Sequence, residues 1–199
     1  SDPSVLIARA GFYARTDKPT LALEDFNAAI AADAADAEAY NGRGALYANA
    51  LADPDAALRD VMKAVELKPL EAGYHYNLGA LRLRGRLYRK ALESFDAALA
   101  LNGPQARLLE RRAESKFLLG DHTGALNDID AALAKDPGGA TIYDTLGHLR
   151  LREHDFDQAV RDLSQALQLN ARLAGAYIHR GRAYGAMGQL KEAQTDFNT

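Results

Sequence analysis

The side chains that could do chemistry in this chain of 199 residues begin with its five histidines. They are His75, His122, His148, His154 and His179. No two of them have the HExxH or HxxxH spacing that places two imidazoles on one face of a helix for a metal ion. The chain has no cysteine, which excludes disulfides, thiolate metal sites and cysteine nucleophiles. We therefore expect no metal centre.

The other residue types used in catalysis are present without the arrangement that catalysis needs. The 16 glycines form no GxxxxGK[ST] or GxGxxG loop that could hold a phosphate group. No serine stands in a nucleophile elbow with a matching histidine and aspartate. The 27 Asp and Glu residues always offer carboxylate pairs, so such a pair indicates catalysis only where a cleft holds it. The sequence thus predicts a protein that is not an enzyme and uses no cofactor.

Charge and hydrophobicity narrow the class of partner. The 24 Lys and Arg residues are nearly balanced by the 27 Asp and Glu residues, for a formal net charge of −3. Non-specific binding to nucleic acid needs many unopposed basic side chains, so we expect no nucleic-acid partner. No apolar run approaches the roughly 20 residues that cross a bilayer, and Ser1–Ser4 has no signal-peptide character, so we expect no membrane insertion. A cytoplasmic and a periplasmic location both stay open.

The elements that must position any functional side chain are helices that recur at a fixed period. Alanine, the best helix former, supplies 40 of the 199 residues. Pro69, Pro104 and Pro137 each end an apolar helical pattern and lie 35 and 33 residues apart. A period near 34 predicts repeats at 3–36, 37–71, 72–105, 106–139, 140–173 and, incomplete, 174–199. The second repeat has one extra residue, which we place in the turn around Asp53 and Pro54.

Three columns of this alignment predict how the helices pack. The first column is small and reads Ala10, Gly44, Gly79, Ala113, Gly147 and Gly181. The second is alanine throughout and reads Ala22, Ala57, Ala91, Ala125, Ala159 and Ala193. The third is large and apolar and reads Phe26, Val61, Phe95, Ile129, Leu163 and Phe197. Helical spacing around these columns predicts two helices per repeat, and neither can bury its apolar stripe unless neighbouring repeats stack as a solenoid.

This pattern resembles the tetratricopeptide repeat. In the second repeat the resemblance is carried by Tyr40, Gly44, Tyr47, Ala57, Val61, Ala64 and Pro69. It covers essentially the whole chain and implies an all-α fold, a right-handed α-solenoid of about six helix-turn-helix repeats, in a single domain over residues 1–199. The sequence departs from the family pattern where Arg82, Lys116 and Arg150 replace the late aromatic residue of the first helix.

Arginine and aspartate also recur together at two positions of the repeat. The pairs within repeats are Arg9–Asp25, Arg43–Asp60, Arg112–Asp128 and Arg180–Asp196. The third repeat has Leu78 and Ser94 at these positions and so loses both partners. A partly buried guanidinium group needs a partner, so we interpret the pairs as links between the two helices of a repeat.

The resemblance implies a place for a partner as well. In tetratricopeptide repeat proteins the first helices line a concave groove, and peptide partners lie along it. On this sequence the implied peptide-binding residues are Asn41, Tyr76, Asn77, Arg84, Arg107, Arg111, Phe117, His148, Arg152, His179 and Arg182. The same surface includes Glu110, Glu114, Asp144 and Thr145. The two aromatic residues of the set are equally consistent with groove contacts and with packing between repeats.

Three residues of this set suggest a more specific hypothesis. Asn77, Arg107 and Arg111 match three of the five positions at which some chaperone-binding members of the family hold a terminal carboxylate. Two guanidinium groups can hold a carboxylate while an amide binds the peptide backbone. The other two positions differ from the family pattern, and Glu110 and Glu114 could neutralise the arginines. A carboxylate clamp and an internally paired, solvated surface therefore both stay open.

We interpret the chain as a non-enzymatic protein-protein interaction scaffold that binds an extended peptide or a partner helix in its groove. Two alternatives stay open: a self-assembling structural scaffold, and the recruiting domain of a larger enzyme. The last repeat stops within its second helix without the polar cap that usually ends a repeat array. We therefore expect that the C-terminal end can support a homo-oligomer.

Overall fold

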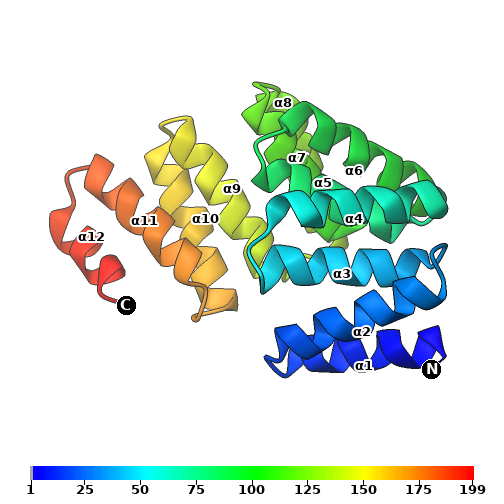
Figure 1. The fold of residues 1–199 in the computed structure, drawn as a ribbon. Coiled ribbons are helices and arrows are strands. Elements are labelled where there is room, and N and C mark those ends of the chain that lie inside the picture. The colour runs from blue at the N-terminus through cyan, green and yellow to red at the C-terminus, as the bar shows by residue number, and fades with distance from the viewer. Residues whose placement is uncertain (1) are drawn as a thin grey trace. The chain divides into compact units, whose positions relative to one another are not determined.

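The computed structural model describes residues 2–199, and this part of the chain contains twelve helices and no strand (Figure 1). The first helices of the six pairs are α1 (Pro3–Arg15), α3 (Ala37–Asn49), α5 (Ala72–Arg84), α7 (Ala106–Leu118), α9 (Ala140–Arg152) and α11 (Ala174–Ala186). The second helices are α2 (Pro19–Ala32), α4 (Pro54–Leu67), α6 (Tyr88–Asn102), α8 (His122–Lys135), α10 (Phe156–Leu169) and α12 (Leu190–Phe197). The all-α fold with about six helix-turn-helix repeats is confirmed, and every first helix begins where its repeat was predicted to begin.

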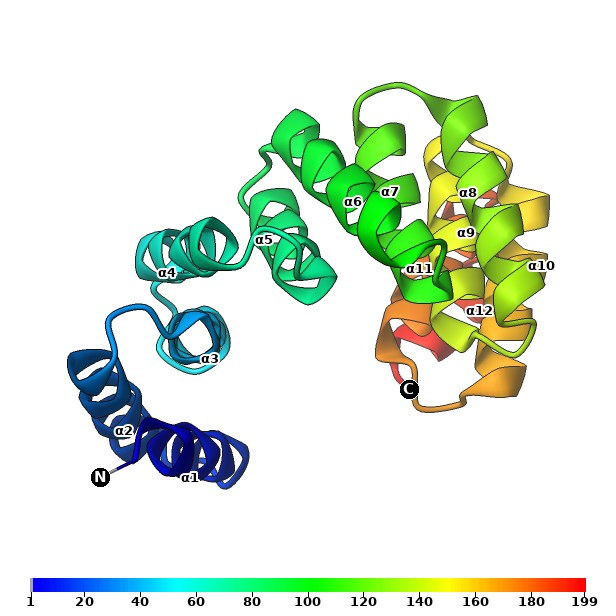
Figure 2. The same ribbon diagram turned by 90° about the vertical axis from the view of Figure 1, so that its right-hand side faces the viewer.

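The helices form two compact units, one ending at Gly103 and the other beginning at Pro104. Each unit holds three helix pairs, and Figure 2 shows the pairs α1–α2, α3–α4 and α5–α6 of the first unit one after another. In the first unit α3 contacts both α1 and α5, and in the second unit α9 contacts both α7 and α11. The first helices thus lie against one another within each unit. That residues 1–199 form a single domain stays a prediction.

Aspartate caps and prolines define where many of the helices begin. The Asp2 carboxylate accepts a hydrogen bond from the Ser4 backbone N–H, with Pro3 in the first turn. Asp36 and Asp53 accept backbone N–H groups in the same way at the starts of α3 and α4. These bonds satisfy donors that the first turn of a helix leaves without a partner.

The two helices of a repeat approach closely because a small residue in one faces a large residue in the other. A Cβ atom added at Gly79 would lie 2.6 Å from the Phe95 ring, and one added at Gly147 would lie 2.5 Å from the Leu163 side chain. Such distances are well inside van der Waals contact, so these glycines leave no room for a side chain. The alanines of the second column are buried in all six repeats. The predicted columns therefore form the contact between the paired helices.

All four predicted arginine–aspartate pairs are present. Their shortest N–O distances are 2.6 Å for Arg9–Asp25, 2.7 Å for Arg43–Asp60, 2.6 Å for Arg112–Asp128 and 2.7 Å for Arg180–Asp196. In each pair the guanidinium group donates through Nε and a terminal nitrogen to both carboxylate oxygens. The four carboxylates are buried, so this bidentate contact satisfies charges that have lost their water. The interpretation as links within a repeat is confirmed.

The basic residues that depart from the family pattern supply the same link one helical turn later. In the fifth repeat, where Leu146 occupies the arginine position, Arg150 donates to Asp162 over 2.6 Å. In the third repeat Arg82 donates to Ser94 Oγ over 2.7 Å. Residues four apart share a helix face, so a cation can move by one turn and still reach the second helix.

One residue with positive φ lies in the turn between the two helices of every repeat. These residues are Asp17, Ala52, Arg86, Gly120, His154 and Gly188. The left-handed conformation costs an L-residue about 1–2 kcal/mol, whereas glycine adopts it freely. The turn of the second repeat spans residues 50–53 and is one residue longer than the others, which confirms where the extra residue was placed.

Two surface features bear on partners. Leu190 and Phe197 of α12 are 71% and 55% exposed, and association through this end of the second unit stays a prediction. Among residues 2–199, no helix combines the length and the apolar character needed to cross a membrane.

We predict that removing the charge of Asp128 strongly destabilises the second unit. Asp128 is 4% exposed and lies 2.6 Å from Arg112 and 2.9 Å from Lys116. The change Asp128→Asn leaves two largely buried cations without their carboxylate, so we expect the free energy of unfolding to fall by about 3 kcal/mol. Urea unfolding followed by circular dichroism measures the change.

The control for this variant is Glu114→Gln, which makes the same chemical change at a more solvent-accessible pair in the same unit. The side chains of Arg111 and Glu114 are 41% and 33% exposed, so we expect a loss below about 0.5 kcal/mol. A loss of similar size in both variants would contradict the role of the buried link.

We predict that Ala52→Gly stabilises the first unit by about 0.5–1 kcal/mol, because Ala52 has a φ of 52°. Ala50→Gly is the matched control: Ala50 lies in the same turn with a φ of −115°, so glycine there only adds entropy to the unfolded chain and destabilises. Thermal unfolding compares the two variants. Stabilisation by both, or by neither, would contradict the prediction.

Candidate functional site

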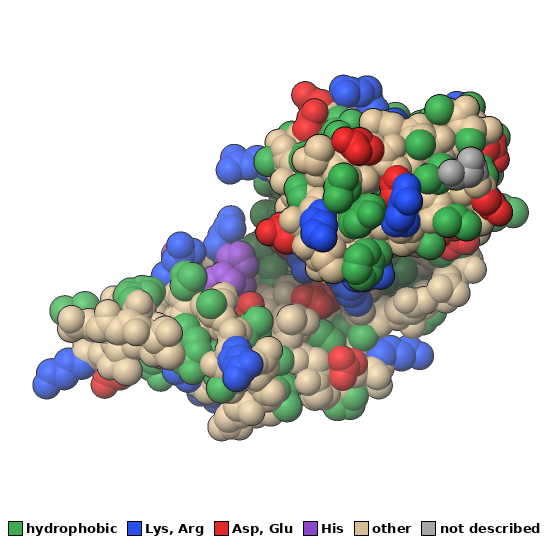
Figure 3. Space-filling model, turned by 60° about the horizontal axis from the view of Figure 1, so that its bottom comes forward, with side chains coloured by type: hydrophobic (Ala, Val, Ile, Leu, Met, Phe, Trp, Pro, Cys, Tyr) green, Lys and Arg blue, Asp and Glu red, His purple; other side chains and the backbone are tan. Residues whose placement is uncertain are grey.

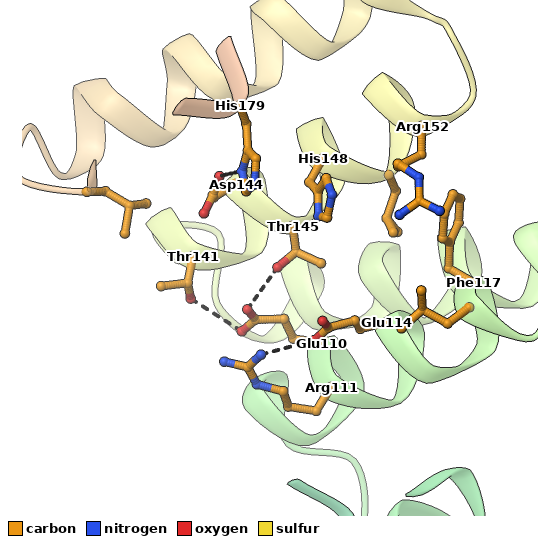
Figure 4. Close-up of a pocket in the computed structure, with 13 residues that line it drawn as sticks. Glu110, Arg111, Glu114, Phe117, Thr141, Asp144, Thr145, His148, Arg152 and His179 are labelled. Carbon is orange, nitrogen blue, oxygen red and sulfur yellow. Dashed lines mark hydrogen bonds and ion pairs between the residues drawn. The ribbon is translucent and has the colours of Figure 1, made fainter. Parts of the chain in front are cut away.

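A pocket of about 320 Å³ lies in the second unit between the first helices α7, α9 and α11 (Figure 4). Its walls combine charged and polar side chains with the Phe117 ring and three leucines. The lining residues are Glu110, Arg111, Glu114, Phe117, Leu118, Thr141, Asp144, Thr145, His148, Leu149, Arg152, Leu173 and His179. Most of them come from the surface that the repeat pattern assigned to a partner.

A buried carboxylate and two hydroxyl groups form one wall of the pocket. Glu110 of α7 is 5% exposed, yet within the described residues it has no basic side chain within 4 Å. Its oxygens accept hydrogen bonds from Thr145 Oγ1 over 3.0 Å and from Thr141 Oγ1 over 3.3 Å. Two neutral donors thus stabilise the charge and connect α7 to α9.

Two stacked imidazole rings form the opposite wall. His148 of α9 and His179 of α11 lie 4.3 Å apart between ring centroids, with their planes 2° apart. His179 Nδ1 donates to Asp144 Oδ1 over 2.7 Å, which orients that ring (Figure 4). The His148 ring has no hydrogen bond to any residue from 2 to 199, and no buried side-chain nitrogen or oxygen in that range lacks a partner, so the His148 nitrogens are open to the pocket.

The surroundings of His148 keep its ring neutral. Burial lowers the pKa of His148 from 6.5 to about 4, and the charges of His179, Arg152 and Arg182 lower it as well, against the opposing effect of Asp144. A neutral imidazole offers one donor and one acceptor nitrogen. Within the described chain, no three histidine, aspartate or glutamate side chains are placed to hold a metal ion.

The remaining charged side chains of the pocket differ in how they are paired. Arg111 donates to Glu114 over 3.1 Å, so one of the two glutamates next to the predicted clamp does neutralise an arginine. The Arg152 guanidinium carbon lies 5.9 Å from the centre of the Phe117 ring, a cation–π contact. Phe117 is only 8% exposed, so it both packs and lines the pocket. Figure 3 shows a histidine side chain at the surface with basic side chains beside it.

The structure brings together five of the residues implied for peptide binding: Arg111, Phe117, His148, Arg152 and His179 all line the pocket. Arg182 lies outside the lining but acts on the pKa of His148. In the second unit Arg107 is exposed near the start of α7.

The other implied residues belong to the first unit. Asn77 Nδ2 donates to Asn41 Oδ1 over 2.9 Å, which joins α5 to α3. Tyr76 is half-buried with its ring 5.9 Å from that of Phe95, a packing contact within the repeat. Arg84 is exposed at the end of α5. The clamp of Asn77 with two arginines of the second unit stays a prediction, as does the peptide-binding role of every residue in the set.

Sequence reasoning missed the histidine stack because it searched for metal spacing within one helix. His148 and His179 are 31 residues apart, three less than the repeat period. Adjacent first helices place residues near one repeat apart side by side, so a search at spacings of 31–37 residues would have paired them. It would also have paired Asp144 with His179.

Six helix pairs whose first helices lie against one another within each unit define an α-solenoid repeat protein. Family models described as tetratricopeptide repeat match residues 76–140 and residues 174–199. Over these two segments the chain therefore carries repeats of the tetratricopeptide repeat family. Proteins of this family bind protein and peptide partners and are generally not enzymes.

Individual proteins show the same likeness. The human mitochondrial import receptor subunit TOM70 is 26% identical over 98% of this chain, which spans only 33% of that relative. A tetratricopeptide repeat protein of Parabacteroides merdae has a TM-score of 0.87 at 20% identity, over 98% of this chain and 76% of that one. YrrB, described as having an unusual peptide-binding site, has a TM-score of 0.61 at 20% identity, over 87% of this chain and 89% of that one.

We predict that His148 makes the folded protein less stable in mild acid. Its pKa of about 4 lies below the 6.5 of an unperturbed histidine, so the unfolded chain takes up a proton first as the pH falls. Protonation of His148 should leave the free energy of unfolding unchanged above pH 6.5 and should lower it between pH 6.5 and 4. Solvent screening at this half-buried ring limits the loss to about 2 kcal/mol.

Urea unfolding at a series of pH values, combined with NMR titration of the imidazole signals, measures this effect. The variant His148→Gln should remove most of the loss of unfolding free energy between pH 6.5 and 4. The variant His75→Gln, at a histidine of the first unit, should retain this loss. A His148 signal that titrates near 6.5 would show the prediction to be wrong.

Proposed function

We propose that this chain is a non-enzymatic scaffold that binds an extended peptide segment of a partner protein across α7, α9 and α11. The pocket between these helices is the observation that carries the proposal. Its volume of about 320 Å³ lies at the lower end of the range of about 300–1,000 Å³ for ligand pockets. A peptide that seats one side chain there can extend along the neighbouring first helices.

The polar groups of the pocket suit an extended backbone better than a helix. An extended peptide presents free N–H and C=O groups that need both acceptors and donors, whereas a helix satisfies most of its own. The neutral His148 ring offers one donor and one acceptor, and the Thr141 and Thr145 hydroxyls can accept as they donate to Glu110. The Phe117 ring adds an apolar surface for a side chain.

Relatives support the proposal through what their names state. YrrB is described as a tetratricopeptide repeat protein with a peptide-binding site, and TOM70 as an import receptor subunit. The first description states peptide binding, and the second states a receptor role. The pocket of the second unit supports the same role for this chain.

The test begins with peptides selected on the intact chain from a random phage-displayed library and then synthesised. We predict that Thr141→Tyr weakens their binding at least about tenfold, or about 1.4 kcal/mol. Thr141 is exposed and lines the pocket, so a tyrosine there can narrow the pocket without entering the core. Isothermal titration calorimetry measures the affinity.

The matched control is Gln168→Tyr, which adds the same ring at an exposed position on the second helix α10. This variant should bind the peptides as the unchanged protein does. If no peptide is enriched over a library selected without protein, or if both variants bind alike, the proposal is wrong.

A further inference from the structure

The pocket contains a polar group that the fold leaves unused. The His148 ring is half-buried and held flat against His179, which is itself held by Asp144. Stacking determines the orientation of the ring without using either nitrogen. Because both nitrogens are open to the pocket, a ligand atom can bond to them in place of water.

Two arginines flank this ring. Arg152 follows His148 by one turn of α9, and Arg182 follows His179 by three residues on α11. Both are exposed, and within residues 2–199 neither has a carboxylate within 4 Å. We name these four residues the His–Arg corner. Arg111 and Arg150, which also lie on first helices of the second unit, by contrast bond to Glu114 and Asp162.

Every acidic group that faces the corner is already engaged. On α7, Glu110 accepts from two threonine hydroxyls, and Glu114 accepts from Arg111. On α9, Asp144 accepts from the His179 ring of α11. Glu110 keeps its charge at the opposite wall of the pocket, whereas the positive charges of Arg152 and Arg182 lie at the His–Arg corner. Burial lowers the pKa of His148 most, and both flanking arginines lower it further.

We propose that the His–Arg corner binds the carboxylate of an aspartate or glutamate side chain in the partner peptide. The inference rests on the proposed function, because it assumes that a peptide lies on this face. The His148 N–H and the Arg152 and Arg182 guanidinium groups can together supply three or more donors, and a carboxylate can accept about four. Both arginines are exposed, so a peptide chain can continue past them in both directions, which favours a side-chain carboxylate over a chain end.

The proposal has a consequence for protonation. A carboxylate at the corner favours the charged imidazole and raises the pKa of His148 above about 4. The complex then takes up a proton at a higher pH than the free protein does. Binding of an acidic peptide should therefore tighten as the pH falls below about 6 and should show no such dependence near pH 7 to 8.

The first experiment uses acetate as the smallest carboxylate and the intact chain. NMR titration measures the pKa of His148 in sodium acetate and in sodium chloride at equal ionic strength. We expect acetate to raise this pKa by about half a unit or more. Arg152→Gln and Arg182→Gln should raise the pKa in chloride and weaken the response to acetate. Arg161→Gln, at an exposed arginine of α10 that bonds to Gln158, is the matched control and should change neither.

The second experiment uses a peptide selected on this chain as described above. Each Asp or Glu is changed singly to Asn or Gln, and the C-terminus is amidated separately. One side-chain change should weaken binding at least about tenfold to the unchanged protein and much less to Arg152→Gln, as a double-mutant cycle shows. A loss caused only by C-terminal amidation, or no dependence on any acidic group, would overturn the proposal.

The two experiments separate this inference from the proposed function. If peptides bind and depend on Thr141 but not on a carboxylate, the proposed function holds and the inference fails. If no peptide binds but acetate shifts the pKa of His148, the corner binds carboxylates and the proposed function fails. A His148 pKa that is equal in acetate and chloride overturns the inference whatever the peptide result.

Discussion

The close contact between a small residue of the first helix and a large residue of the second controls the geometry of the repeats. At Gly79 and Gly147 the facing Phe95 and Leu163 side chains occupy the space of a missing Cβ atom. This contact determines the distance between the two helices of a repeat. The packing of successive helix pairs then determines the spacing between neighbouring first helices. Any larger residue would separate the helices and change what the first helices of adjacent repeats bring together. The shape of the pocket between α7, α9 and α11 thus depends on contacts between paired helices that lie outside the pocket itself.

Ionic links add orientation to this packing. An arginine that reaches a buried aspartate with two hydrogen bonds permits few relative positions of the two helices. Burying such a pair adds little to stability by itself, but losing one partner is costly, so the arrangement penalises misaligned repeats. The fifth repeat shows that the link and not the position matters, since Arg150 reaches Asp162 from one turn later. With the paired helices held in this way, the remaining face of each first helix can vary from repeat to repeat.

The candidate site is formed by the faces of the first helices whose residues differ from repeat to repeat. Equivalent turns of α7, α9 and α11 carry a carboxylate, hydroxyl groups and imidazoles, and they satisfy one another where they meet. His148 is the exception, because stacking on His179 leaves both of its nitrogens open. Its surroundings keep it neutral and place two arginines beside it. An uncharged ring with basic neighbours is suited to recognising an acidic group, and its own protonation would report the binding.

The sequence by itself determined the repeat boundaries, the helix pairs, the contact columns and the arginine–aspartate links. Each of these lies within one repeat, so six copies of the pattern reveal it at a constant spacing. The shifted link from Arg150 was also open to sequence reasoning, since four residues make one helical turn. Only the tertiary structure decided which side chains of the first helices meet across repeats. A spacing near one repeat makes the stack of His148 on His179 possible, but whether the rings meet depends on helix separations and rotamers, which differ from repeat to repeat.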